Sequence, residues 1–258
     1  MAIKGQFNTD AKALNRRICA HDKYGTKDIN EWIFRNLGLA RSMSILDLGC
    51  GTGKQTIPLA KLVGHEGAVL SVDISQEALN VLLEEATKKG LSEQVTALCC
   101  SLDDVHIHLQ NRRFDRVLSS YSLYYAQDPG NLIKTIWEVL KPGGHFFFCG
   151  PARDNNGELK AFHYSLEGVP VPPENGGSVF MEEIGQRLVR EVFPKVEVTF
   201  FENPLRFTSP EALHAYWSSY NLYEDKLDDS FKVTASEHFN KNAVFITKKR
   251  VIGIKAVK

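Results

Sequence analysis

Short apolar runs alternate with amphipathic helical patterns over residues 45–150, and this alternation constrains the fold more than any other feature. The runs are apolar throughout, which predicts strands buried on both faces, as in a parallel sheet covered by helices. The predicted strands are residues 45–48, 68–72, 95–100, 115–120 and 145–149. Because ligands bind such sheets at the carboxyl ends of the strands, the residues after each strand are expected along one rim.

Residues 151–178 have a different character, because they contain four prolines and many glycines and asparagines. They predict a long irregular loop, and loops of that length are usually functional. A helix is expected over 180–192 and a strand over 196–201. Ser209 and Pro210 open another helix, and a last strand covers 243–247 or continues to 254.

Composition excludes several classes of protein. The 258 residues carry 31 basic and 31 acidic side chains, so the formal net charge is zero, and the strong cationic field of a nucleic-acid or anionic-membrane binder is missing. Lys248–Arg250, Lys255 and Lys258 are interpreted as a solvated cationic tail. No stretch approaches the roughly 20 apolar residues of a membrane span, and no secretion signal is recognised.

Five cysteines without a C-x-x-C pair argue against a disulfide framework or a zinc site. The sequence thus predicts a cytoplasmic protein with reduced cysteines, no metal, no nucleic-acid or membrane partner, and a monomeric or homodimeric state.

A glycine-rich turn follows the first predicted strand. Gly49, Gly51 and Gly53 let the backbone approach a ligand beside a helix N-terminus. Asp47 precedes the first glycine by two positions, and its carboxylate would repel a pyrophosphate but suits a ligand with an ammonium group.

Four segments resemble the motifs of class I S-adenosylmethionine-dependent methyltransferases. Ile45–Gly53 resembles motif I, Val72–Ser75 the motif at the end of the second strand, and Phe114–Ser119 and Leu140–Gly144 those of the fourth and fifth strands. All four occur in the expected order and spacing. The layout is similar to the small-molecule branch, which includes ubiquinone-biosynthesis-like and natural-product methyltransferases.

The resemblance implies an α/β, Rossmann-like fold with a seven-stranded, mostly parallel sheet and helices on both faces. It also implies an N-terminal helical cover and an inserted lid, placed after strand five and between strands six and seven. The whole chain, 1–258, is then one methyltransferase domain: cover 1–40, cofactor-binding core 41–150, and 151–258 with the substrate loop, lid helices and last two strands.

The resemblance assigns residues to the methionine end of S-adenosylmethionine. Asp47 and the backbone from Gly49 through Gly51 to Gly53 would hold the amino-acid part. Ser119 would offer its backbone near the same moiety.

Other positions match the nucleoside end of the cofactor. Asp73 would accept hydrogen bonds from both ribose hydroxyls, and Ile74 would pack on the adenine. Ser101 and Leu102 fall at the adenine edge, where Ser101 replaces the usual carboxylate. Either the Ser101 hydroxyl serves there or Asp103 takes over.

The expected reaction moves a methyl group from S-adenosylmethionine to an oxygen, nitrogen or carbon atom of a small-molecule metabolite. His21, Tyr121 and His163 are the candidates for catalytic groups, and Tyr24 could close over the cofactor. A non-catalytic S-adenosylmethionine-binding scaffold or partner subunit is the alternative. A nicotinamide-dependent oxidoreductase fits poorly with Asp47 and Lys54.

Overall fold

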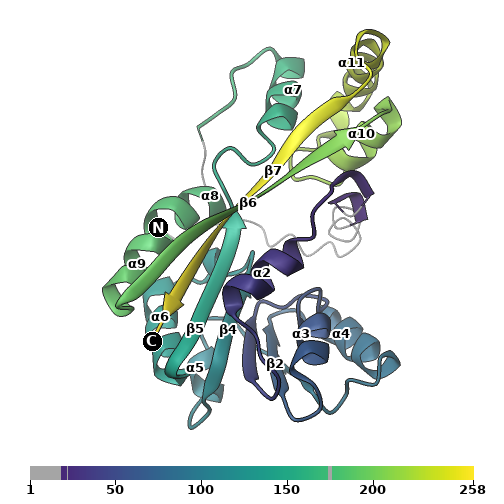
Figure 1. The fold of residues 1–258 in the computed structure, drawn as a ribbon. Coiled ribbons are helices and arrows are strands. Elements are labelled where there is room, and N and C mark those ends of the chain that lie inside the picture. The colour runs from purple at the N-terminus through teal and green to yellow at the C-terminus, as the bar shows by residue number, and fades with distance from the viewer. Residues whose placement is uncertain (1–18, 22, 174–175) are drawn as a thin grey trace.

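A seven-stranded sheet organises the computed structural model, which describes residues 19–21, 23–173 and 176–258 (Figure 1). The strand order is β3-β2-β1-β4-β5-β7-β6, with β7 antiparallel to both of its neighbours and the remaining neighbours parallel. The strands are β1 (Ser44–Leu48), β2 (Ala68–Asp73), β3 (Val95–Cys99), β4 (Phe114–Ser120), β5 (Leu140–Pro151), β6 (Lys195–Phe207) and β7 (Phe245–Val257). This confirms the predicted Rossmann-like, mostly parallel sheet.

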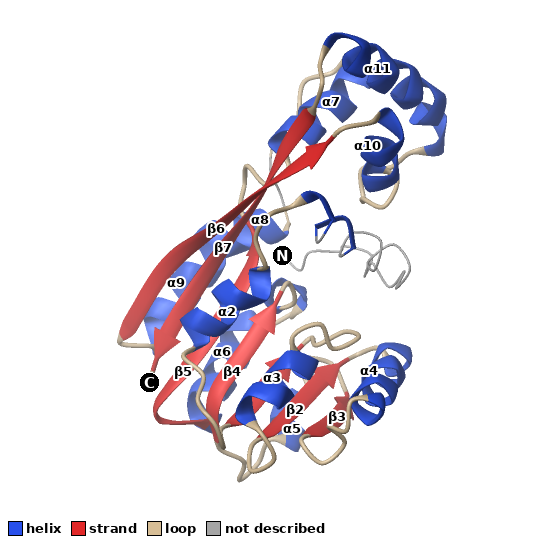
Figure 2. Cartoon of the chain, turned by 45° about the vertical axis from the view of Figure 1, so that its right-hand side comes forward, coloured by secondary structure: helices blue, strands red, loops and turns tan. Residues whose placement is uncertain are grey.

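Helices cover both faces of this sheet, because successive strand side chains point to opposite sides and both sides are apolar (Figure 2). Ile45 and Phe147 face α2 (Ile29–Leu37), α3 (Thr56–Val63) and α4 (Gln76–Lys88). Leu46 and Phe146 face the second set of helices. That set comprises α5 (Val105–His108), α6 (Pro129–Val139) and α9 (Gly185–Val192).

Three of the helices begin at the caps expected from their sequences. Ser75 accepts a hydrogen bond from the Ala78 backbone N–H at 3.2 Å, and Ser209 caps α10 (Pro210–Trp217) in the same way. Asp128 accepts from the Asn131 N–H at 2.9 Å. Each cap pairs a donor that the first helical turn leaves without a partner.

The outer halves of β6 and β7 run beyond the sheet and carry a second lobe (Figure 2). Pairing of β5 with β7 ends at Pro151↔Val251, whereas the β6–β7 ladder continues to Phe207↔Phe245. The lobe contains α7 (Gly157–Glu167), α10, the short η3 (Asp225–Leu227) and α11 (Asp228–Lys241). It has its own apolar core, in which Trp217 stacks on Phe231 with ring centroids 4.1 Å apart.

The prediction of a long irregular loop over residues 151–178 was wrong, because α7 lies inside it. Two of the residues that suggested a loop are the ends of that helix. Asn156 is its N-cap, with φ 55°, and Gly168 its C-cap, with φ 67°. After the prolines, the chain forms α8 (Gly177–Val179), the π-helical turn η2 (Phe180–Ile184) and then α9.

The N-terminal segment crosses from α2 toward the second lobe. Residues 19–21, 23 and 24 are helical, while residues 1–18 and 22 of the predicted cover lie outside the described residues. Asn203 on β6 fixes this segment: its Oδ1 accepts from the N–H groups of Thr26 at 2.9 Å and Lys27 at 3.3 Å, and its Nδ2 donates to the Lys27 carbonyl at 3.0 Å. Gly25 is required beside it, because a Cβ there would lie 2.3 Å from Asn203 Nδ2.

None of the helices in the described part of the chain is long and apolar enough to cross a membrane.

Replacing Asn203 should therefore loosen the N-terminal segment. Asn203 is 1% exposed, so Asn203→Ala removes three hydrogen bonds and leaves the backbone groups of Thr26 and Lys27 without their partner. The expected loss in the free energy of unfolding is about 1–3 kcal/mol, measured by urea denaturation. Asn242→Ala, at an exposed asparagine, is the matched control. Equal small effects in both variants would contradict this role for Asn203.

Candidate active site

A cavity of about 1280 Å³ opens at the carboxyl ends of the parallel strands and reaches the second lobe. Nine of the residues predicted for the site line it: His21, Gly49, Gly51, Asp73, Ile74, Ser101, Leu102, Asp103 and Tyr121. The other five predicted residues do not line it: Tyr24, Asp47, Gly53, Ser119 and His163. The same rim therefore gathers segments that are far apart in the sequence.

Each of the three positions in the turn requires glycine for its own structural reason. All have positive φ, at 69°, 54° and 88° for Gly49, Gly51 and Gly53. A Cβ on Gly49 would lie 2.2 Å from the Ser122 Cβ, and one on Gly53 would lie 2.3 Å from a Leu82 methyl. A Cβ on Gly51 would meet no atom within 4 Å. The outer two glycines thus permit tight packing, and Gly51 presents open backbone to the cavity.

Asp47 lies beneath the turn rather than on the cavity surface. It is 1% exposed, and Thr56 Oγ1 donates to its Oδ2 at 2.7 Å. Ser71 Oγ in turn donates to Thr56 Oγ1 at 3.2 Å. Burial raises the pKa of Asp47 to about 7; the Thr56 hydrogen bond opposes this rise and the charge of Asp73 adds to it.

Asp73 joins the turn to the second strand. Its Oδ2 accepts from the Gly51 N–H at 2.7 Å, and its Oδ1 accepts from the Ser75 N–H at 2.9 Å. Each carboxylate oxygen has a further lone pair for a ligand hydroxyl. Ile74 is 53% exposed beside it and offers an apolar surface to the cavity.

Asp103 ties the loop after β3 to the loop after β4. Its carboxylate accepts from the backbone N–H groups of Gln127 and Asp128, with shortest distances of 2.9 Å. Ser101 Oγ accepts from the Asp103 N–H at 3.2 Å. The structure thus gives Asp103 partners within the protein and leaves both Ser101 and Asp103 on the cavity wall.

The segment after β4 packs directly against the glycine turn. Ser122 Oγ donates to the Leu48 carbonyl at 2.6 Å and lies 2.7 Å from Ser119 Oγ, which is fully buried. Tyr121 stands between them in sequence, with φ 59°, a strained conformation for a tyrosine. Its hydroxyl is buried without a hydrogen-bond partner among the described residues, and burial raises the pKa of Tyr121 well above its usual value.

A chain of polar contacts links β7 to the second lobe. The Lys249 ammonium lies 2.7 Å from His21 Nδ1 and 5.6 Å from the centroid of the Tyr121 ring. Because a charged ammonium can only donate, His21 Nδ1 accepts and the ring hydrogen sits on Nε2. His21 Nε2 lies 3.2 Å from the Tyr216 hydroxyl, which also receives a hydrogen bond from Asn156 at 3.0 Å.

The interpretation of residues 248–250 as part of a solvated tail was wrong for Lys249. This residue is only 8% exposed and lines the cavity. Sequence reasoning missed it since three consecutive basic residues suggest a solvated surface. Alternation along β7 was the available signal: Lys248 is exposed and Lys249 is buried.

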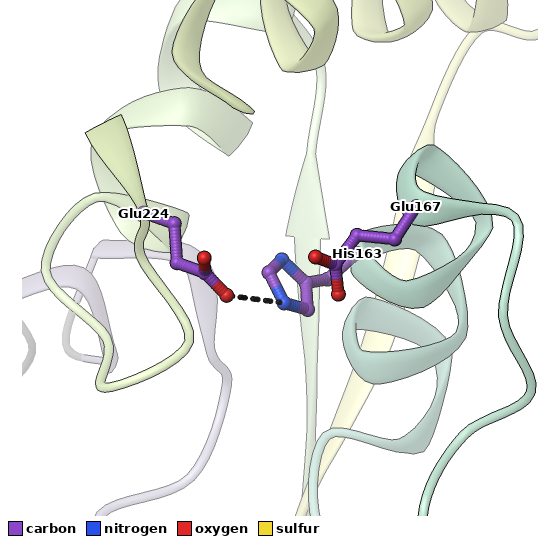
Figure 3. A group of neighbouring side chains, drawn as sticks. All are labelled: His163, Glu167 and Glu224. Atoms are coloured by element: carbon purple, nitrogen blue, oxygen red, sulfur yellow. Dashed lines mark ion pairs between the residues drawn. The ribbon is translucent and has the colours of Figure 1, made fainter. Parts of the chain in front are cut away.

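His163 lies in the second lobe with Glu167 and Glu224 (Figure 3). It is 1% exposed, and the Trp217 indole N–H donates to its Nδ1 at 3.3 Å. This donor fixes the His163 proton on Nε2, where Glu224 Oε1 lies 3.9 Å away. Burial lowers the pKa of His163, which keeps the ring neutral.

The same three side chains are a poor metal site. A metal on His163 Nε2 would require the ring proton on Nδ1, where it would face the Trp217 N–H. The Lys226 ammonium already lies 2.9 Å from Glu167 Oε1 and 2.9 Å from Glu224 Oε2. The group is therefore an ion-pair cluster whose cation is Lys226.

Tyr24 packs inside the second lobe, with its ring centroid 4.7 Å from that of Phe207. Several cavity residues were not assigned a role from the sequence, among them Asn155, Asn156 and Lys160. They belong to the segment that was expected to be irregular.

Comparison with known proteins places this geometry in a family. A family model described as a methyltransferase domain matches residues 39–191. Demethylmenaquinone methyltransferase from Lactobacillus johnsonii is 32% identical over 134 residues, 51% of this chain and 54% of the relative. The tRNA 5-carboxymethoxyuridine methyltransferase from Escherichia coli is 32% identical over 142 residues, 54% and 53% of the two chains.

A further relative, an aklanonic acid methyltransferase from a Streptomyces species, is 31% identical over 143 residues, 54% of this chain and 64% of the relative. The chain thus matches about half the length of most of these curated relatives. Among solved structures, a SAM-dependent methyltransferase from Aquifex aeolicus has a TM-score of 0.59 at 15% identity, covering 98% of this chain and 99% of that one. This likeness shows the shared fold.

The raised pKa of Asp47 should make stability depend on pH. Around neutral pH the folded protein retains a proton on Asp47 that the unfolded chain releases. The contribution of this group to the free energy of unfolding is therefore complete below about pH 4 and is lost as pH rises through about 7. Asp47→Asn keeps the Thr56 hydrogen bond without this titration. As pH rises from about 4 to above 7, the wild type should lose free energy of unfolding relative to the variant. The difference should change in favour of the variant by on the order of 2–4 kcal/mol, measured by urea unfolding.

Asp104→Asn, at an exposed aspartate, is the matched control for this measurement. If Asp47→Asn and the wild type follow the same pH profile, Asp47 is not held protonated in the folded protein.

Proposed function

Because the chain belongs to the methyltransferase domain family, we propose that it is an S-adenosylmethionine-dependent enzyme that methylates a small-molecule metabolite. The observation that carries the proposal is one cavity wall that combines the open backbone of Gly51 with the Asp73 carboxylate. The first suits a ligand that approaches the backbone closely, and the second suits a diol.

The described residues fit the two ends of this cofactor. Asp73 would accept hydrogen bonds from the ribose hydroxyls, and the exposed side chain of Ile74 would cover the adenine. The glycine turn would hold the amino-acid part. Asp47 would act from beneath without direct contact, once the ammonium group of the ligand favours its ionised form. Ser101 and Leu102 would border the adenine edge.

When bound, S-adenosylmethionine supplies an activated methyl group on a sulfonium, so the protein mainly has to align the acceptor and exclude water. Tyr121 would serve this task, since it follows β4 next to Ser122, which packs on Gly49, and its side chain lines the cavity. Its raised pKa keeps the hydroxyl protonated near neutral pH, so it would act as a hydrogen-bond donor to the acceptor. Among the described histidines, His21 lines the cavity and His163 does not.

The second lobe supports a small-molecule acceptor, because its residues Lys160, Tyr164 and Tyr220 line the cavity opposite the glycine turn. The zero net charge argues for the same class rather than for a nucleic acid. All five cysteines are free, as expected in a reducing compartment, which supports a cytoplasmic location. Relatives that act on demethylmenaquinone and aklanonic acid support this proposal, although one acts on tRNA.

Transfer is tested by incubating the protein with methyl-labelled S-adenosylmethionine and a cell extract. We expect the label in the small-molecule fraction that passes an ultrafiltration membrane. Label found only in the RNA or protein fraction would contradict a metabolite acceptor.

Asp73→Ala should weaken binding of S-adenosylhomocysteine by about 1–3 kcal/mol, the loss of charge-assisted hydrogen bonds to the ribose. Titration calorimetry measures the affinity, and thermal unfolding without ligand checks that the turn held by Asp73 survives. Glu77→Ala removes an exposed carboxylate from the same wall and should bind the ligand like the wild type. A folded Asp73→Ala protein with unchanged affinity would exclude the ribose assignment.

A further inference from the structure

The peptide bond between Leu48 and Gly49 begins the glycine turn, and both of its polar groups are hydrogen-bonded. The Gly49 N–H donates to the Val72 carbonyl of β2 at 2.7 Å. The Leu48 carbonyl accepts from Ser122 Oγ, in the loop after β4, at 2.6 Å. Because β2 and β4 are the two neighbours of β1 in the sheet, this peptide is held from both sides.

Such support is needed because a glycine forms one side of this peptide. Gly49 has φ 69°, and a residue without a Cβ offers little steric resistance to rotation of the adjoining peptide plane. Ser122 also occupies the space beside it, since a Cβ on Gly49 would lie 2.2 Å from the Ser122 Cβ. The hydrogen bond and the packing of Ser122 together fix the orientation in which the turn begins.

A second serine orients the Ser122 hydroxyl. Because the Leu48 carbonyl oxygen can only accept, the hydrogen of Ser122 Oγ points to it. Ser119 Oγ lies 2.7 Å from Ser122 Oγ and must therefore donate to it. Ser122 borders the cavity, whereas Ser119 is fully buried and does not. The two hydroxyls thus form a chain that runs from the interior of β4 to the start of the turn.

The backbone between the two serines is shaped for this contact. Tyr121 has φ 59°, and its N–H donates to the Cys149 carbonyl of β5 at 2.8 Å. A residue in this left-handed conformation changes the direction of the chain sharply, which places Ser122 against β1 rather than in line with β4. Conformations of this kind are retained where the surrounding contacts demand them, and they cluster at functional sites.

We propose that Ser122, oriented by Ser119, is a positioning residue for the amino-acid end of S-adenosylmethionine. It holds the peptide between Leu48 and Gly49 so that the turn presents its backbone to that end of the cofactor. The inference rests on the proposed function and adds to it two residues that act through the glycine turn.

The nucleoside end of the cofactor depends on different contacts. Asp73, assigned to the ribose, accepts from the Ser75 N–H at 2.9 Å, and that bond does not involve the loop after β4. Ile74, assigned to the adenine, belongs to the same segment after β2. Loss of the Ser122 hydroxyl should therefore weaken binding of the amino-acid part of a ligand and spare binding of its nucleoside part.

Two ligands that differ in the amino-acid part test the inference. S-adenosylhomocysteine contains this part, and 5′-methylthioadenosine has the same nucleoside and sulfur without it. In Ser122→Ala the Leu48 carbonyl loses its partner, so titration calorimetry should show S-adenosylhomocysteine binding about 10-fold more weakly. Binding of 5′-methylthioadenosine should change by less than about 2-fold. Unchanged affinity for S-adenosylhomocysteine in the folded variant, or equal weakening of both ligands, would overturn the inference.

Ser119→Ala tests whether the effect passes through the turn. The Ser119 side chain does not line the cavity, so this variant cannot lose a side-chain contact with a ligand. It should shift the two affinities in the same direction as Ser122→Ala, by about 3-fold for S-adenosylhomocysteine. An unchanged ratio of the two affinities would contradict the inference, and this holds even where Ser122→Ala does not fold.

Ser120→Ala, between the two positions, is the matched control. The Ser120 hydroxyl accepts from the Cys149 thiol at 3.6 Å and makes no hydrogen bond to the glycine turn among the described residues. This variant should bind both ligands like the wild type. A loss as large as that of Ser122→Ala would show that any serine of this segment has the effect, which contradicts a particular role for Ser122.

The wild-type titrations separate this inference from the proposed function. If the wild type does not bind S-adenosylhomocysteine, the proposed function fails, and the inference fails with it. If the wild type and a folded Ser122→Ala protein bind that ligand equally well, only the inference fails.

Discussion

The β6–β7 ladder is the interaction on which the rest of the structure depends. Thirteen residues of each strand pair in one register, from Lys195↔Val257 to Phe207↔Phe245, so one ribbon belongs both to the central sheet and to the second lobe. This continuity fixes the lobe over the carboxyl ends of the parallel strands. Asn203 and Lys249, which face each other in the ladder, then hold the N-terminal segment and one wall of the cavity.

The glycine turn shows how two carboxylates that are close in space acquire different tasks. Asp73 is partly exposed, accepts two backbone hydrogen bonds and lines the cavity, so its carboxylate remains available to a ligand. Asp47 is buried, has one hydroxyl donor and stands near the charge of Asp73, so its pKa rises to about 7. A ligand with an ammonium group above the turn would favour ionisation of Asp47, which couples recognition of the amino-acid end to proton release.

Much of the core could be predicted because local chemistry and tertiary structure agree there. The strands predicted between residues 45 and 150 are apolar runs, and Ser75, Asp128 and Ser209 cap the helices that their side chains predict. The second lobe was harder. Asn156 and Gly168 suggested a loop, but they are the caps of α7, whose buried side chains face a lobe core built from residues far along the chain.

The sequence by itself determined the order of strands and helices up to residue 150 and placed the turn, Asp73 and Tyr121 along one rim, because these depend on local periodicity and on the general geometry of parallel sheets. Only the tertiary structure decided that Asp47 lies beneath the rim, that His163 belongs to an ion-pair cluster, and that Lys249 faces the cavity. The physical reason is that burial and charge partners are set by contacts between distant segments. Lys249 lies 228 positions from His21 in the chain but 2.7 Å from it in space.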